Sequence, residues 1–135
     1  MRKRILDSNK LINHWHAEWI KAKNRRSQLT KDDVRQWAQN LIASVQNDAI
    51  LTPIYIEFIA GTRSSNELEL ACTFLGEFNC IDNGEITSQD WREAERYAMR
   101  VPKDGHPREL VDCLIKAIAK RLRMDIDTAD KRFAR

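Results

Sequence analysis

The sequence contains few cysteines and no long apolar run. Its 135 residues include only three cysteines, Cys72, Cys80 and Cys113, too few and too scattered for a disulfide framework or a paired zinc motif. Their neighbours are apolar, so we expect reduced core thiols in a cytoplasmic protein. The longest stretch without a charged residue, Gln36 to Asn47, spans 12 residues. A membrane span needs roughly 20 apolar residues, so we expect a soluble protein with no membrane partner.

The start of the chain also lacks the features of an export signal. Residues 2–4 are basic, but only Ile5 and Leu6 follow before the charged Asp7, so we expect no apolar export core. No internal repeat, low-complexity tract or linker divides the rest of the chain. The length predicts one domain, residues 1–135, that buries roughly two-thirds of the surface of its unfolded chain.

Neither sign of charge dominates the composition. Twenty-three Lys and Arg residues against 20 Asp and Glu residues give a net charge of +3, which by itself argues only weakly for a polyanionic partner. The basic residues are nevertheless grouped, and we expect most of them on a solvated surface and some on a phosphate-binding rim. The four groups are Lys3–Arg4, residues 21–31, residues 116–123 and residues 131–135.

Short strand-like segments alternate with helical patterns along the chain. Helix caps are expected at Thr30, Ser64 and Thr87 or Ser88, and Pro53 and Pro107 suit first helical turns. The expected strands are residues 5–6, 49–53, 79–81 and 124–128, and the expected helices cover residues 10–21, 34–45, 54–60, 65–78, 91–98 and 107–123. This order predicts an α/β fold, a three-layer α/β/α sandwich with a mostly parallel central sheet.

The four tryptophans fall at helical spacing beside other apolar residues. Trp15, Trp19, Trp37 and Trp91 could stack on nucleic-acid bases, as aromatic side chains do in single-strand binding. Their spacing instead favours a place in the core or at a helix–helix interface.

Four acidic residues lie near the positions where functional sites are found in such a fold. In open parallel sheets, sites lie beyond the carboxyl ends of the strands. Asp7 follows the first expected strand, Glu57 lies on the helix after the second, and Asp130 follows the last. Asp112 borders the apolar stripe of its helix. Each acid also has an ordinary structural interpretation: a helix cap for Asp7, a partly exposed helix position for Glu57, an ion pair for Asp112 and a turn for Asp130.

Convergence of the four acids would require a counter-charge. Carboxylates within several ångströms of one another repel and lose hydration. A divalent cation resolves that conflict, and oxygen ligands without His or Cys favour Mg²⁺ or Mn²⁺. Such an ion polarises phosphoryl oxygens and activates water.

The acidic segments also resemble a known family. ILDSNKLI, the lone Glu57 after Pro53, DCLIKAIA and TADKRF resemble, in order, the four acidic motifs of PIN-domain ribonucleases, especially VapC-type toxins of bacterial toxin–antitoxin pairs. The resemblance implies a parallel sheet flanked by helices and Mg²⁺- or Mn²⁺-dependent RNA cleavage. It makes Asp7, Glu57, Asp112 and Asp130 the metal-binding acids, with Asn9 as the polar neighbour of the first acid and Thr128 as the hydroxyl before the last.

The same resemblance implies partners. Family members form homodimers and are silenced by a cognate antitoxin, whose inserted peptide brings an Arg or Lys to the acids. Two positions depart from the family pattern: Lys116 replaces a small apolar residue, and Arg132 stands where a further acid is common. We therefore expect one firmly held Mg²⁺, with any second ion recruited together with the RNA phosphate.

Two other classes of protein remain as alternatives. One is an RNA-binding or regulatory module without turnover, which Arg132 keeps open. The other is a receiver-like signalling domain, which we rank far lower. Its phosphoacceptor Asp should end a middle strand, whereas Asp82 belongs to an ordinary turn sequence.

Overall fold

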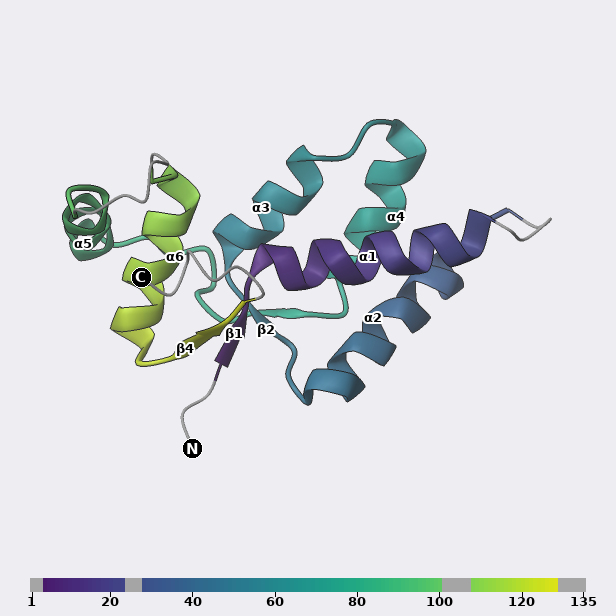
Figure 1. Ribbon diagram of the computed structural model, residues 1–135, viewed down its shortest axis with the longest axis horizontal. Helices are drawn as coiled ribbons and strands as arrows, with labels where there is room; N and C mark the ends of the chain where they lie inside the picture. Colours follow the sequence, from purple (N-terminus) through teal and green to yellow (C-terminus); the bar gives the residue numbers. More distant parts are fainter. Residues whose placement is uncertain (1–3, 24–27, 101–107, 129–135) are drawn as a thin grey trace.

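The structure is a computed structural model that describes residues 4–23, 28–100 and 108–128 (Figure 1). Within these residues the chain forms six helices and four strands. In chain order they are β1 (Arg4–Leu6), α1 (Ser8–Lys23), α2 (Lys31–Val45), β2 (Ala49–Ile50), α3 (Thr52–Ala60), α4 (Ser65–Leu75), β3 (Asn79–Cys80), α5 (Ser88–Ala98), α6 (Leu110–Leu122) and β4 (Asp125–Asp127).

The predicted three-layer sandwich with a central parallel sheet is wrong. Over the described ranges, the strands form two separate sheets of two strands each, β1 with β4 and β2 with β3. Both pairs are parallel, but each strand has only two or three residues. Ladders this short cannot provide a continuous central layer, and the helices also pack directly on one another. Helices α1–α4 lie on one side of the strands and α5 and α6 on the other (Figure 1).

The order and position of the elements follow the predictions more closely than the architecture does. Thr30 and Asp33 form a capping box at the start of α2, and Thr87 and Asp90 form another at the start of α5. The Ser64 hydroxyl accepts the backbone N–H of Glu67 at the start of α4. Local hydrogen bonds of this kind are encoded within four residues, so the sequence predicts them well.

An aromatic cluster joins four helices. The Trp15 ring of α1 contacts Trp37 of α2, Phe58 of α3 and Phe74 of α4 edge-on, with ring centroids 5.3, 5.6 and 5.1 Å apart. Trp19 stacks on Trp15 at 5.7 Å. The predicted core or helix-interface position is thus confirmed for these three tryptophans. It is wrong for Trp91, which is 49% exposed on α5.

Helices α5 and α6 pack as a pair with their own small apolar cluster, Ala94, Cys113, Leu114 and Ala117. A charge pair links the same two helices. Arg121 Nε lies 2.9 Å from Asp90 Oδ1, and the Asp90 side chain is almost completely buried. Burial alone would raise the pKa of Asp90, but the hydrogen bonds from Arg121 and Thr87 and the charge of Arg121 together hold this pKa below its ordinary value. The ion pair therefore stabilises the α5–α6 packing at neutral pH.

None of the described helices combines the length and the apolar character that a membrane span requires. None of the three cysteines, all of which lie in the described ranges, forms a disulfide; Cys113 is buried, in agreement with the predicted core position, whereas Cys72 and Cys80 are only half-buried.

Replacing Trp15 should destabilise the fold far more than replacing Trp91. Trp15→Ala removes the ring shared by four helices, and we expect the free energy of unfolding to fall by about 3–5 kcal/mol. Trp91→Ala changes an exposed side chain and should alter this free energy by about 0.5 kcal/mol. Urea unfolding followed by circular dichroism would measure both. Equal losses for the two variants would contradict a core centred on Trp15.

The ion pair between Arg121 and Asp90 should contribute to the free energy of unfolding by an amount that depends on pH. Arg121→Met leaves Asp90 buried without its guanidinium and should lower the free energy of unfolding at pH 7 by about 2–3 kcal/mol, less than for a wholly buried pair because Arg121 is partly exposed. The pKa of Asp90 is lowered in the folded state, so the contribution is present above about pH 4 and is lost as the pH falls through the folded pKa.

Denaturant unfolding of wild type and Arg121→Met between pH 7 and pH 2.5 would test this expectation. Arg35→Met is the matched control, because Arg35 and its partner Asp32 are both exposed on α2; it should cost less than about 1 kcal/mol at any pH. If the difference in the free energy of unfolding between wild type and Arg121→Met stayed constant down to pH 2.5, the charge of Asp90 would not be the cause of the lost stability.

Candidate functional site

Asp7 lies at the carboxyl end of β1, where the chain turns into α1. Its backbone N–H donates to the Asp127 carbonyl at 3.0 Å, which extends the pairing of β1 with β4 by one residue. Its own carbonyl accepts the backbone N–H of Lys10 at 3.1 Å, as the residue before a helix does. The predicted position after the first strand is confirmed. The side chain is only 3% exposed, so its carboxylate is held inside the protein.

Thr128 and Asn9 form a hydrogen-bonded group with the Asp7 carboxylate. Thr128 Oγ1 lies 2.8 Å from Asp7 Oδ2, and Asn9 Nδ2 lies 2.9 Å from Thr128 Oγ1. Because the threonine has a single hydroxyl proton, the consistent arrangement is that Asn9 donates to Thr128 and Thr128 donates to Asp7. The three side chains come from both ends of the chain. One Asp7 oxygen is therefore fixed in direction by a residue that follows β4.

The other acids identified in the sequence have different surroundings. Glu57 is half-buried on α3, and Asp112 is half-buried in the first turn of α6. Helices α3 and α6 pack against each other, so the elements that carry these two acids are neighbours. Asp130 lies outside the described residues. The convergence of all four acids therefore stays a prediction.

The oxygen atoms around Asp7 meet some, but not all, of the requirements of a site for a hard cation such as Mg²⁺. In the part of the chain that the structure describes, no group of three or more His, Cys, Asp or Glu side chains is close enough to hold a metal ion. An all-protein cage is thus not formed by the described acids. Mg²⁺, however, is commonly held by one or two carboxylates together with water and substrate phosphate. Asp7, buried and oriented by Thr128, fits the role of one such carboxylate.

Lys116 lies on α6 one turn after Asp112. Its pKa is lowered, first by burial and then by the positive charges of Arg108 and Arg100, while Asp112 opposes this shift. Its Nζ also lies 5.8 Å from the centre of the Tyr97 ring. Lys116 and Asp112 therefore interact electrostatically, as the ordinary structural interpretation of Asp112 predicts, but nearby cations outweigh that single acid.

Asp82 has a structural role that the sequence did not reveal. Its carboxylate is 3% exposed and accepts both the backbone N–H and the hydroxyl of Thr52, the latter at 2.7 Å. These bonds attach the start of α3 to the chain just after β3. The sequence predicts only the turn, which the positive φ angles of Asn83 and Gly84 confirm. The available signal was Thr52, a polar residue at the first position of a mostly apolar helix.

Comparison with known proteins adds no family assignment. The sequence matches no protein-family model and no curated protein.

The Thr128 hydroxyl should be needed to hold Asp7. Thr128→Val keeps the shape of the side chain but removes the donor to Asp7 Oδ2, and we expect the free energy of unfolding to fall by about 1–3 kcal/mol at pH 7. Thr128→Ser retains the hydroxyl and should recover most of this loss. Thermal or urea unfolding of the three proteins would measure the difference. A valine variant as stable as wild type, or a serine variant no more stable than the valine variant, would show that the Thr128 hydroxyl is not what stabilises Asp7.

Proposed function

We propose that the chain is a metal-dependent ribonuclease that hydrolyses RNA phosphodiester bonds at a site centred on Asp7. The observation that carries the proposal is the fixed, buried Asp7 carboxylate at the junction of β1, β4 and α1. A buried carboxylate away from the surface lowers stability unless it is compensated, and such groups concentrate at functional sites. The resemblance of ILDSNKLI and TADKRF to ribonuclease motifs gives the proposal its substrate class.

The residues around Asp7 have distinct parts in the proposed site. Asp7 supplies an oxygen ligand, and Thr128, backed by Asn9, holds this oxygen in one direction. Glu57, Asp112 and Asp130 are the proposed further ligands, directly or through water. When bound, Mg²⁺ or Mn²⁺ would polarise the scissile phosphate and lower the pKa of a bound water.

The proposal also includes the partners that VapC-type toxins have. The resemblance suggests a homodimer and a cognate antitoxin that places an Arg or Lys beside the acids, where a cation would replace the charge of the metal. It also suggests action on cytoplasmic RNA. The alternative is that the chain is an RNA-binding or regulatory module, which binds RNA without cutting it.

Asp7→Asn should abolish RNA cleavage. The substitution keeps the size of the side chain but removes the charge that attracts a metal, and we expect the rate to fall by about 100-fold or more. The measurement is cleavage of a panel of labelled RNAs by wild type and variant, with Mg²⁺, with Mn²⁺ and with EDTA. Circular dichroism would establish that the variant is folded.

Asp32→Asn is the matched control for this experiment. Asp32 is an exposed residue on α2, with 91% of its side chain accessible, so its substitution removes the same charge away from the site and should leave cleavage unchanged. Contaminating nucleases also need metals, but they would be equally active in all three preparations. Equal cleavage by wild type and Asp7→Asn would reject the proposal, and tight RNA binding without cleavage would favour the alternative.

A further inference from the structure

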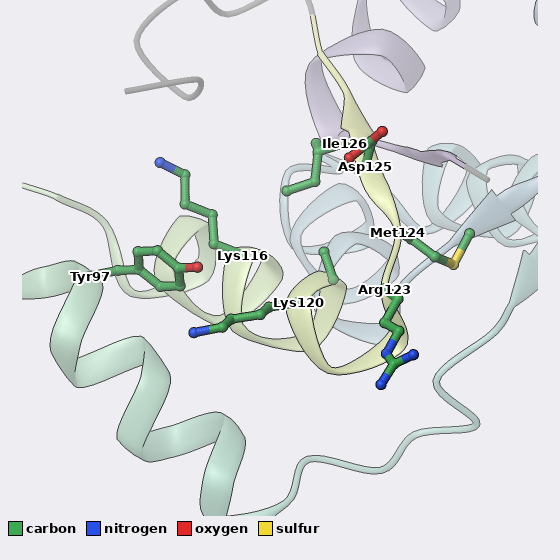
Figure 2. Close-up of a pocket in the computed structure, with 8 residues that line it drawn as sticks. Tyr97, Lys116, Lys120, Arg123, Met124, Asp125 and Ile126 are labelled. Atoms are coloured by element: carbon green, nitrogen blue, oxygen red, sulfur yellow. The ribbon is translucent and has the colours of Figure 1, made fainter. Parts of the chain in front are cut away.

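A groove lined by three cationic side chains and one acid, Asp125, lies between α5, α6 and β4 (Figure 2). Its volume is about 280 Å³, near the lower end of the range for ligand pockets. Tyr97 of α5 forms one wall, Lys116, Lys120 and Arg123 come from α6, and Asp125 and Ile126 come from β4. Figure 2 shows Lys116 and Lys120 one turn apart on α6 near Tyr97, with Arg123 at the end of the helix.

The cations of the groove differ in their present partners. Lys120 Nζ lies 3.0 Å from Glu93 Oε2 and therefore helps to join α6 to α5. Arg100 lies over the face of the Tyr97 ring, 4.5 Å from its centre. Lys116 is partly buried among Arg100 and Arg108, and these charges lower its pKa even though Asp112 is near. An anion in the groove would relieve this repulsion.

The Tyr97 ring helps to identify the chemical class of the ligand. Cations approach it in two places, Arg100 at 4.5 Å and Lys116 at 5.8 Å. A face covered by a guanidinium is not open for stacking by a nucleic-acid base. The groove therefore favours charged phosphate groups over bases, which would give binding with little dependence on sequence.

Strand β4 connects the groove to the proposed catalytic site. Ile126 lines the groove, and Thr128, two residues further on, holds Asp7. Two residues of extended chain span about 7 Å. On α6, Lys116 lies one turn from Asp112, on the same side of the helix. The groove and the Asp7 site are thus built in part on the same strand and the same helix, so the phosphates next to the scissile one are the proposed link between them.

We propose that the groove formed by Tyr97, Lys116 and Arg123 binds the phosphate backbone of single-stranded RNA next to the scissile position. The choice of RNA rests on the proposed ribonuclease function. The groove itself needs no metal and no cleavage.

The test is RNA binding by the double variant Lys116→Gln/Arg123→Gln. Fluorescence anisotropy with a labelled single-stranded RNA of mixed sequence, in EDTA and at several salt concentrations, would measure the dissociation constant. We expect affinity to fall by about tenfold and the slope of log K against log salt to decrease in magnitude by about 1.4, since two phosphate contacts are lost at about 0.7 each.

Lys31→Gln/Arg35→Gln is the matched control. It removes two positive charges from α2, at the opposite end of the molecule from α5 (Figure 1), where both residues make exposed ion pairs. It should leave affinity within about twofold of wild type. Equal losses of RNA affinity in the two double variants would show that only net charge matters. This result would overturn the proposal that the groove binds RNA. Unchanged binding by the groove variant, or no RNA binding by wild type, would also overturn it.

Asp7→Asn separates this proposal from the proposed function. Wild-type affinity in Asp7→Asn, together with weak binding by the groove variant, supports the groove even if no preparation cuts RNA. Cleavage that depends on Asp7 but is unaffected in rate and affinity by the groove substitutions would retain the ribonuclease and reject the groove.

Discussion

The hydrogen bond from Thr128 to Asp7 joins two residues that are 121 positions apart in the sequence. The strands that bring them together are only three residues long, so their ladder supplies few backbone hydrogen bonds. The bond from the Asp7 N–H to the Asp127 carbonyl and the Lys10–Asp127 ion pair at 3.4 Å extend this connection. The entry into α1 and the exit from β4 are thereby fixed to each other. The orientation of the Asp7 carboxylate depends on this long-range contact.

Two helical groups hold the strands between them. On one side, the rings around Trp15 bury apolar surface from four helices at once; on the other, the Asp90–Arg121 pair and a few small side chains hold α5 to α6. Hydrophobic burial is the larger of these contributions. It can offset the cost of burying a carboxylate at Asp7. The α5–α6 pair combines its apolar cluster with polar contacts, and this is the part of the protein that forms the groove.

The parts of the structure that the sequence predicted are those encoded by near neighbours. Capping boxes such as Thr30–Asp33 are complete within four residues, and helix positions follow from them. The sandwich was wrong because strand length and pairing depend on distant segments, and the Trp15 cluster draws the helices together without a continuous sheet. At the site, the sequence identified Asp7, Asn9 and Thr128 but not their hydrogen bonds. The Tyr97 groove was missed because its residues come from three elements and share no motif.

The proposed site and the groove carry opposite charges, and an RNA-cleaving protein needs both. Acidic ligands suit a metal ion but repel the phosphates that flank the one being cut, and a single bound cation compensates for only part of this repulsion. Side-chain cations beside the acids can compensate for the rest, provided that they do not collapse onto the carboxylates. Lys116 carries such a charge one turn from Asp112; burial and the cations Arg100 and Arg108 lower its pKa, and Asp112 opposes that shift. A side-chain cation beside an acid would offset part of the repulsion, which is a physical reason for a lysine where the resemblance leads one to expect a small apolar residue.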